Sequence, residues 1–128
     1  MMMSEEADMT RHLVPSLRLL VEHQVPWTIV RVSGELGWES HAMLDDCLSE
    51  LVLEPERPCV CIDLTALEFC DSSGIACMVR AWRTATRKGG LLIVVRPSGY
   101  LARKLRRMGL DDVLPVVNEP PGNCGPSL

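Results

Sequence analysis

The amino-acid sequence predicts one α/β domain: a mixed, mostly parallel β-sheet of about four to five strands, flanked by helices and opened by an antiparallel hairpin. Two observations predict this class. Short runs of aliphatic and β-branched residues alternate with segments of helical periodicity along most of the chain. The chain has 128 residues, near the usual size of a single domain, and 47% of them are hydrophobic, enough to form a packed core.

The hairpin is predicted at residues 17–22 and 28–33. The second of these strands is rich in β-branched residues, and Pro26 lies in the short connection between the two. Strands joined by so short a turn pair antiparallel. The polar residues 1–15 before the hairpin are expected to be a flexible N-terminal segment.

Helices and strands then alternate. A helix is expected over residues 41–53, where leucines recur at helical spacing, and two more at about 73–88 and from Ser98 to Gly109. The apolar runs 59–64 and 91–96 are typical of buried parallel strands, and residues 114–117 are the candidate for a last short one. The domain is therefore expected to span residues 16–117, and the Pro- and Gly-rich residues 118–128 to form a disordered tail.

Charge and hydropathy exclude several classes of function. The net charge of −4 argues against direct nucleic-acid binding, and no apolar run is long enough to span a membrane. Acidic residues near the N-terminus do not fit a secretory signal, so we expect a cytoplasmic protein. One asymmetry stands out: the segment from Arg80 to Arg107 holds nine basic residues and no acidic one. It is either a set of solvated helix faces or a patch for an acidic partner.

The candidate functional segment is D-S-S-G at residues 71–74, where a short connection meets the start of a helix. One interpretation is structural, since Asp and Ser cap a helix and Gly allows a tight backbone path. The other is a phosphoacceptor serine, whose phosphate would be favoured by the helix dipole. Phosphate-binding and nucleophile motifs are absent from the sequence, and we expect no metal and no cofactor.

Five blocks, in this order and at this spacing, resemble the STAS domain family, and within it the bacterial anti-sigma factor antagonists (anti-anti-sigma factors). The resemblance covers about residues 17–117. The blocks are Val32-Ser-Gly-Glu-Leu36, Ile62-Asp-Leu64, Phe69-Cys-Asp-Ser-Ser-Gly-Ile75, Gly89-Gly-Leu-Leu-Ile-Val94 and Met108-Gly-Leu110.

The resemblance implies a partner-switching mechanism with no catalysis by this chain. In such proteins the serine that corresponds to Ser72 is phosphorylated by a serine kinase that is also the anti-sigma factor. The unphosphorylated antagonist binds this kinase and frees the sigma factor, phosphorylation dissociates it, and a phosphatase resets the switch. The resemblance places partner contacts at Asp71, Ser73 and Gly74 and at the loop of Gly37, Trp38 and Glu39. It implies a monomer or weak homodimer, with no membrane or direct nucleic-acid contact.

One position departs from the family pattern. An acidic residue usually follows G-E-L, but here Gly37 and Trp38 follow it, and Glu39 is the candidate substitute. Trp38 is either a core plug or an exposed anchor for a partner. Two other functions stay open: a scaffold or accessory STAS subunit of a stress-signalling complex or lipid transporter without a phosphate cycle, and an enzyme with Ser72 as nucleophile. The enzyme lacks an evident base, since all three histidines precede the serine.

Overall fold

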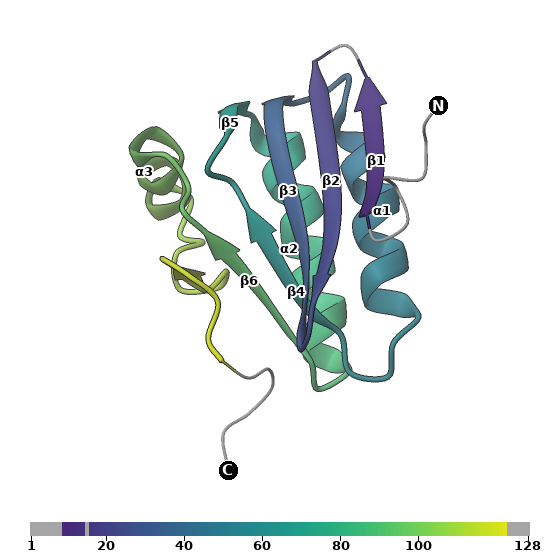
Figure 1. Cartoon of the computed structure of the whole chain (residues 1–128). Coiled ribbons are helices and arrows are strands. Elements are labelled where there is room, and N and C mark those ends of the chain that lie inside the picture. The colour runs from purple at the N-terminus through teal and green to yellow at the C-terminus, as the bar shows by residue number, and fades with distance from the viewer. Residues whose placement is uncertain (1–8, 15, 123–128) are drawn as a thin grey trace, which may run out of the picture.

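The computed structural model of the chain describes residues 9–14 and 16–122, which form a seven-stranded mixed sheet and three helices (Figure 1). The strands follow the order β1-β2-β3-β4-β6-β7, and β5 pairs with β3 beside this path. The strands are β1 (Met9–Val14), β2 (Leu17–Gln24), β3 (Trp27–Leu36), β4 (Cys59–Asp63), β5 (Leu67–Cys70), β6 (Leu91–Val95) and β7 (Val116–Val117). The helices are α1 (His41–Leu53), α2 (Ser72–Arg87) and α3 (Gly99–Arg107).

The predicted fold class is confirmed. Strands β2 and β3 form the expected antiparallel hairpin, and β3, β4, β6 and β7 pair in parallel. The expected number of strands is wrong, because β1 and β5 were not predicted. Strand β1 pairs antiparallel with β2 and lies within the segment expected to be flexible, so that expectation is wrong for residues 9–14.

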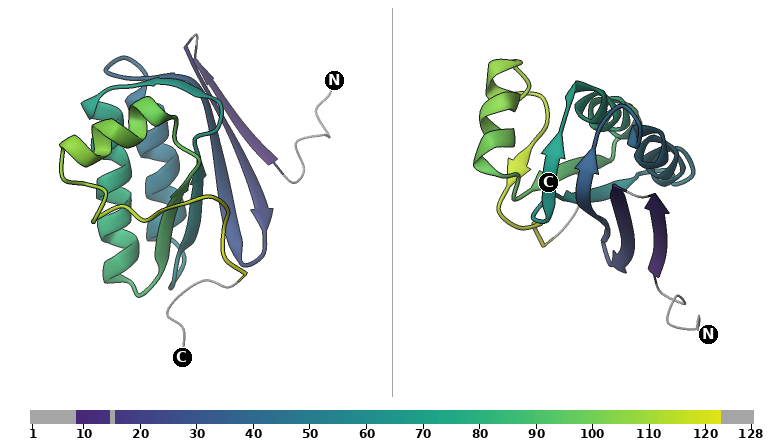
Figure 2. Two further views of the ribbon diagram at one scale, coloured as in Figure 1. Left: turned by 90° about the vertical axis from the view of Figure 1, so that its left-hand side faces the viewer. Right: turned by 90° about the horizontal axis from the view of Figure 1, so that it is seen from above.

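Helices α1 and α2 lie side by side on one face of the sheet (Figure 2). Their apolar stripes form the main core: α1 contributes Leu44 and Leu48, and α2 contributes Ile75 and Met78. Opposite them the sheet presents the inward residues of β3, β4 and β6, such as Val30, Ile62 and Val94. Helix α3 adds Leu101 and Leu105 to the same core, so all three helices are packed through the faces that their spacing predicts.

The opposite face of the sheet carries a second, smaller apolar cluster around Trp27, Ile29 and Ile93. The segment beyond β7 crosses this side of the sheet, away from α1 and α2 (Figure 2). Trp27 Nε1 donates to the carbonyl of Pro121 at 2.8 Å. The first residues of the tail expected to be disordered, 118–122, are therefore held on the sheet, and residues 123–128 lie outside the described part of the chain.

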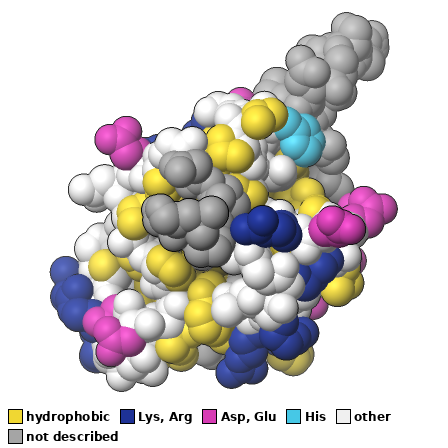
Figure 3. Space-filling model, turned by 90° about the horizontal axis from the view of Figure 1, so that it is seen from below, with side chains coloured by type: hydrophobic (Ala, Val, Ile, Leu, Met, Phe, Trp, Pro, Cys, Tyr) yellow, Lys and Arg dark blue, Asp and Glu magenta, His cyan; other side chains and the backbone are white. Residues whose placement is uncertain are grey.

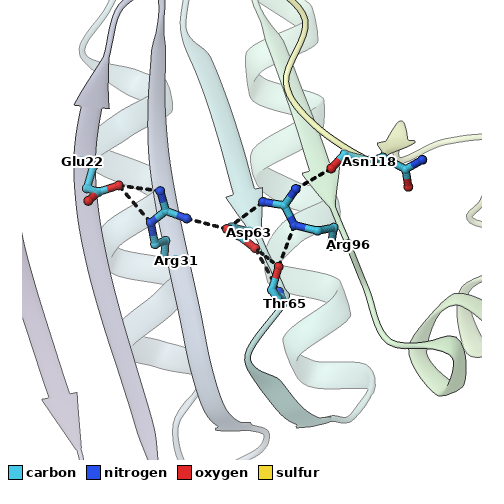
Figure 4. A network of polar contacts seen from close by, with 6 residues as sticks. All are labelled: Glu22, Arg31, Asp63, Thr65, Arg96 and Asn118. Atoms are coloured by element: carbon cyan, nitrogen blue, oxygen red, sulfur yellow. Dashed lines mark hydrogen bonds and ion pairs between the residues drawn. The ribbon is translucent and has the colours of Figure 1, made fainter.

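A polar network ties the strands together on this same face (Figure 4). The side chain of Asp63, at the end of β4, is only 6% exposed and accepts from Arg31 at 2.7 Å and from Arg96 at 3.4 Å. Thr65 donates to it from its backbone N–H and its hydroxyl. Burial raises the pKa of Asp63, but the hydrogen bonds from Thr65 and the charges of Arg96 and Arg31 outweigh it, so the net pKa is lowered.

We expect Asp63→Asn to destabilise the fold by about 2–3 kcal/mol at pH 7, because two arginines lose the carboxylate that they share. Both arginines are nearly half exposed and can be rehydrated, so the loss stays below that of a fully buried pair. The pKa of Asp63 is lower in the folded state than in the unfolded chain. Its stabilisation is therefore present above the unfolded pKa, near 4, and is lost as the pH falls through the folded pKa.

Urea unfolding of the wild type and Asp63→Asn at pH 7 and pH 3 measures this destabilisation and its decrease in acid. Glu22→Gln is the matched control, since it removes an outer carboxylate of the same network and should cost under about 1 kcal/mol. Equal destabilisation by the two variants, or a difference that grows in acid, would contradict the expectation.

The basic segment from Arg80 to Arg107 is partly neutralised within the fold. Arg80 pairs with Asp45 of α1 at 3.0 Å, and Lys88 donates to the backbone carbonyls of Val52 and Leu53 at the end of α1. On the face seen from below, Lys and Arg side chains stand among acidic and hydrophobic ones (Figure 3). This arrangement favours solvated helix faces over a single basic patch. Over the described residues, no helix has the length and apolarity to cross a bilayer.

Candidate functional site

The candidate site begins at the N-terminus of α2, which Asp71 caps. The backbone of Asp71 is extended, and Asp71 Oδ1 accepts from the backbone N–H groups of Ser73 at 2.9 Å and Gly74 at 3.3 Å. These bonds satisfy N–H groups that have no partner inside the helix. The structural interpretation of the D-S-S-G segment is therefore correct for Asp71, and it leaves the role of the serines open.

The two serines of this segment differ in their surroundings. The hydroxyl of Ser73 donates to Asp71 Oδ1 at 2.5 Å, whereas Ser72 is exposed at the first position of the helix. Partial burial raises the pKa of Asp71, but hydrogen bonds from Ser73, Gly74 and Trp38 outweigh it and lower the net pKa. Ser72 thus stands in solvent beside a carboxylate that stays ionised at neutral pH.

The loop after β3 is tied directly to Asp71. The backbone N–H of Asp71 donates to the carbonyl of Leu36 at 3.1 Å, and Asp71 Oδ2 accepts from the backbone N–H of Trp38, also at 3.1 Å. A Cβ at Gly37 would lie 3.0 Å from Asp71 Oδ2. An acidic side chain at position 37 would begin next to a carboxylate, so glycine suits this close approach of the two segments.

An open pocket of about 300 Å³ lies between this loop and Asp71. Its acidic lining residues are Glu35, Glu39 and Asp71, and its aromatic ones are Trp38 and Phe69. Trp38 is 78% exposed and Phe69 is 45% exposed. The interpretation of Trp38 as a core plug is therefore wrong. Its side chain is exposed, as an anchor for a partner would have to be. Sequence reasoning missed Phe69, although its place two residues before Asp71 was a usable signal.

The structure brings most of the predicted partner residues together, with one exception. Gly74 is buried, and a Cβ there would lie 2.5 Å from Leu36 Cγ and 3.0 Å from Cys70 Sγ. Its role is close packing of α2 against the end of β3 rather than contact with a partner.

Four cysteines, Cys47, Cys61, Cys70 and Cys77, are free and buried, as expected of small apolar residues. Within the described ranges, no cluster of His, Cys, Asp and Glu side chains could hold a metal ion.

The chain is similar to proteins of known structure or curated function. The chain is 28% identical over 101 residues to an anti-sigma F factor antagonist of Paenibacillus polymyxa, covering 79% of this chain and 86% of the relative. A crystal structure of an anti-sigma factor antagonist from Mycobacterium paratuberculosis superposes with a TM-score of 0.69 and 26% identity, over 83% of this chain and 90% of that one.

The phosphorylated form of the Bacillus cell fate determinant SpoIIAA also superposes, with a TM-score of 0.64. It is 20% identical, over 79% of this chain and 92% of that one, and shows the shared fold. The family model of the STAS domain matches residues 18–120. The match covers most of the chain and includes both the loop after β3 and the D-S-S-G segment, so this chain belongs to the STAS domain family.

Proposed function

We propose that this protein is an anti-sigma factor antagonist whose binding is switched by phosphorylation of Ser72. In the unphosphorylated state it binds a serine kinase that serves as the anti-sigma factor, so that a sigma factor is released and activates transcription. The observation that carries the proposal is the placement of Ser72: it is exposed and directly follows the ionised Asp71, which lines a pocket together with Trp38 and Phe69. The names of the two relatives above, both anti-sigma factor antagonists, support the first part of the proposal.

The proposed contact surface combines apolar anchors with carboxylates. Large exposed aromatic side chains such as Trp38 and Phe69 are typical centres of protein interfaces, because they bury much area with few rotatable bonds. Glu39 lines the pocket with Asp71 and supplies the acidic group that position 37 lacks. Ser73 is half-buried and positions Asp71 through its hydroxyl, so its role at the interface is indirect.

The phosphate would act through charge. It adds about −1.5 to −2 charges at pH 7, directly beside the carboxylate of Asp71. A partner surface that fits a small neutral hydroxyl would have to bury this charge, which costs far more than burying the serine. The kinase therefore leaves once it has modified Ser72, and a phosphatase restores the binding state.

The proposal includes no catalysis by this chain. The ring of His23 contacts Thr28, and that of His41 contacts Cys77 and Trp38. Neither contact prepares a base for a serine nucleophile. We also propose a cytoplasmic protein that acts without a cofactor, as a monomer or weak homodimer.

Phosphorylation by the cognate kinase and ATP, followed by mass-spectrometric mapping, tests the proposal. We expect phosphate on Ser72, loss of incorporation in Ser72→Ala and retention in Ser73→Ala. Thr65 is an internal control, because its hydroxyl is engaged with Asp63 and Arg96. Phosphate mainly on Ser73 or Thr65 would overturn the assignment. No incorporation into a protein that still binds its partner would favour a scaffold without a phosphate cycle.

A further inference from the structure

We propose that Lys104 of α3 is the cation that pairs with the phosphate on Ser72. The inference rests on the proposed function in one respect, that Ser72 is the modified residue. It assigns a role to a side chain that lies outside the pocket and the D-S-S-G segment.

Helix α3 stands beside the end of the sheet where β5 leads into α2 (Figure 1). Its position is fixed by the burial of Leu101 and Leu105 and by a cap, in which Ser98 Oγ accepts from the N–H of Leu101 at 3.1 Å. From this helix Lys104 reaches back, and its Nζ donates to the backbone carbonyl of Cys70 at 3.2 Å. The half-buried Lys104 side chain also lies over the ring of Tyr100, 5.9 Å from its centroid.

Ser72 lies within reach of this ammonium group. Cys70 and Ser72 are two residues apart, and because consecutive Cα atoms are about 3.8 Å apart, their Cα atoms are separated by at most about 7.6 Å. The four-carbon stem of a lysine rotates freely enough to cover such a shift. A phosphate extends the serine side chain further into solvent, so Lys104 could exchange the neutral Cys70 carbonyl for a charged oxygen, a stronger hydrogen bond.

The negative charges near Ser72 favour a nearby cation once the serine is phosphorylated. Asp71, the preceding residue, is ionised, and Glu35 and Glu39 line the pocket that Asp71 also lines, so these carboxylates disfavour a phosphate on Ser72. Three other cations of α3 are exposed: Arg103, Arg106 and Arg107. Among the described contacts of these four cations, only that of Lys104 reaches the segment leading to Ser72. The start of α2 offers a partial positive charge, and Lys104 would add a full one.

Phosphorylation would thus move Lys104 from the Cys70 carbonyl to the phosphate and hold the new charge within the molecule. An opposite charge nearby favours the doubly ionised phosphate, whose second pKa is then lowered. The three carboxylates act in the opposite direction, so a lowering that depends on Lys104 cannot come from them.

The test uses the full chain with phosphoserine installed at position 72 during translation, so it needs no kinase. Titration followed by ³¹P NMR gives the second pKa of the phosphate, which is near 6 in an unstructured peptide. We expect Lys104→Gln to raise this pKa by about 0.5 unit or more relative to the parent, and Lys104→Arg to restore the lower value. Arg107→Gln is the control, since it removes an exposed charge from the same helix.

Equal phosphate pKa values in the parent, Lys104→Gln and Arg107→Gln proteins would overturn the pairing. So would the same rise in Lys104→Gln and Arg107→Gln, which would indicate only the general field of α3. Because the phosphate is placed synthetically, these outcomes are independent of whether a kinase modifies Ser72, which the mapping experiment above decides.

Discussion

The Ser72→Asp variant is expected to bind the anti-sigma factor about thirty-fold or more weakly than the wild type, a loss of about 2–5 kcal/mol. The added carboxylate stands next to Asp71, which is already ionised, and would be buried against a surface that fits a neutral hydroxyl. Ser72→Ala should bind as tightly as the wild type and resist release by ATP. Ser72→Asn has the size of Asp without its charge, so its affinity separates the effect of side-chain size on binding from the effect of charge.

The same substitution should leave folding almost unchanged. Ser72 is exposed, and a negative charge in the first turn of a helix is favoured by the dipole, so the Tm of Ser72→Asp should equal or slightly exceed that of the wild type. Titration calorimetry against the kinase, with thermal unfolding of each variant, measures both quantities. Equal affinities for all variants, with normal binding of the true phosphoprotein, would eliminate the switch.

Met78→Ala should destabilise the fold by about 2–5 kcal/mol, since it opens a cavity in the main core. Met78 is 0% exposed and lies on the face of α2 that packs against the sheet. Met108→Ala is the matched control, because that side chain is 44% exposed just after α3 and should cost under about 0.5 kcal/mol. Urea unfolding of both variants gives the comparison. A loss under about 0.5 kcal/mol for Met78→Ala would mean that this face of α2 is not packed.

The elements that local pattern specifies were predicted closely. The leucine spacing of α1 gave its observed bounds, His41–Leu53, and α2 begins one residue earlier than expected, at Ser72. Strand β5 was missed because its partner β3 is distant in the sequence. Strand β1 pairs with the adjacent β2 and was missed because its residues show no regular alternation of polar and apolar side chains. Strand β1 mixes polar and apolar residues and, within the described part of the chain, pairs with β2 alone, while the four residues of β5 pair with β3 where its register shifts between Gly34 and Glu35.

In the candidate site, too, local pattern predicts some features, and others depend on contacts between segments distant in the sequence. The role of Asp71 as a cap follows from a short motif at a helix start, whereas the choice of Ser72 over Ser73 came from the family resemblance. The exposure of Trp38 and Phe69 and the contact of Lys104 with Cys70 depend on how the loop after β3, strand β5 and α3 come together in space. A sequence read locally holds no signal for such contacts, since their partners are about 30 residues away or more.

The exposure of Trp38 gives the molecule an optical probe in the loop that we propose as a partner contact. Trp27 is 4% exposed and Trp82 is half-buried, so Trp38, at 78%, is the indole most open to water. Its fluorescence should be red-shifted and readily quenched by iodide in the free protein. A partner that covers the loop would shift that emission to the blue and protect it from quenching. Association and release could then be followed in real time with the unlabelled chain, and Trp38→Phe would identify the signal.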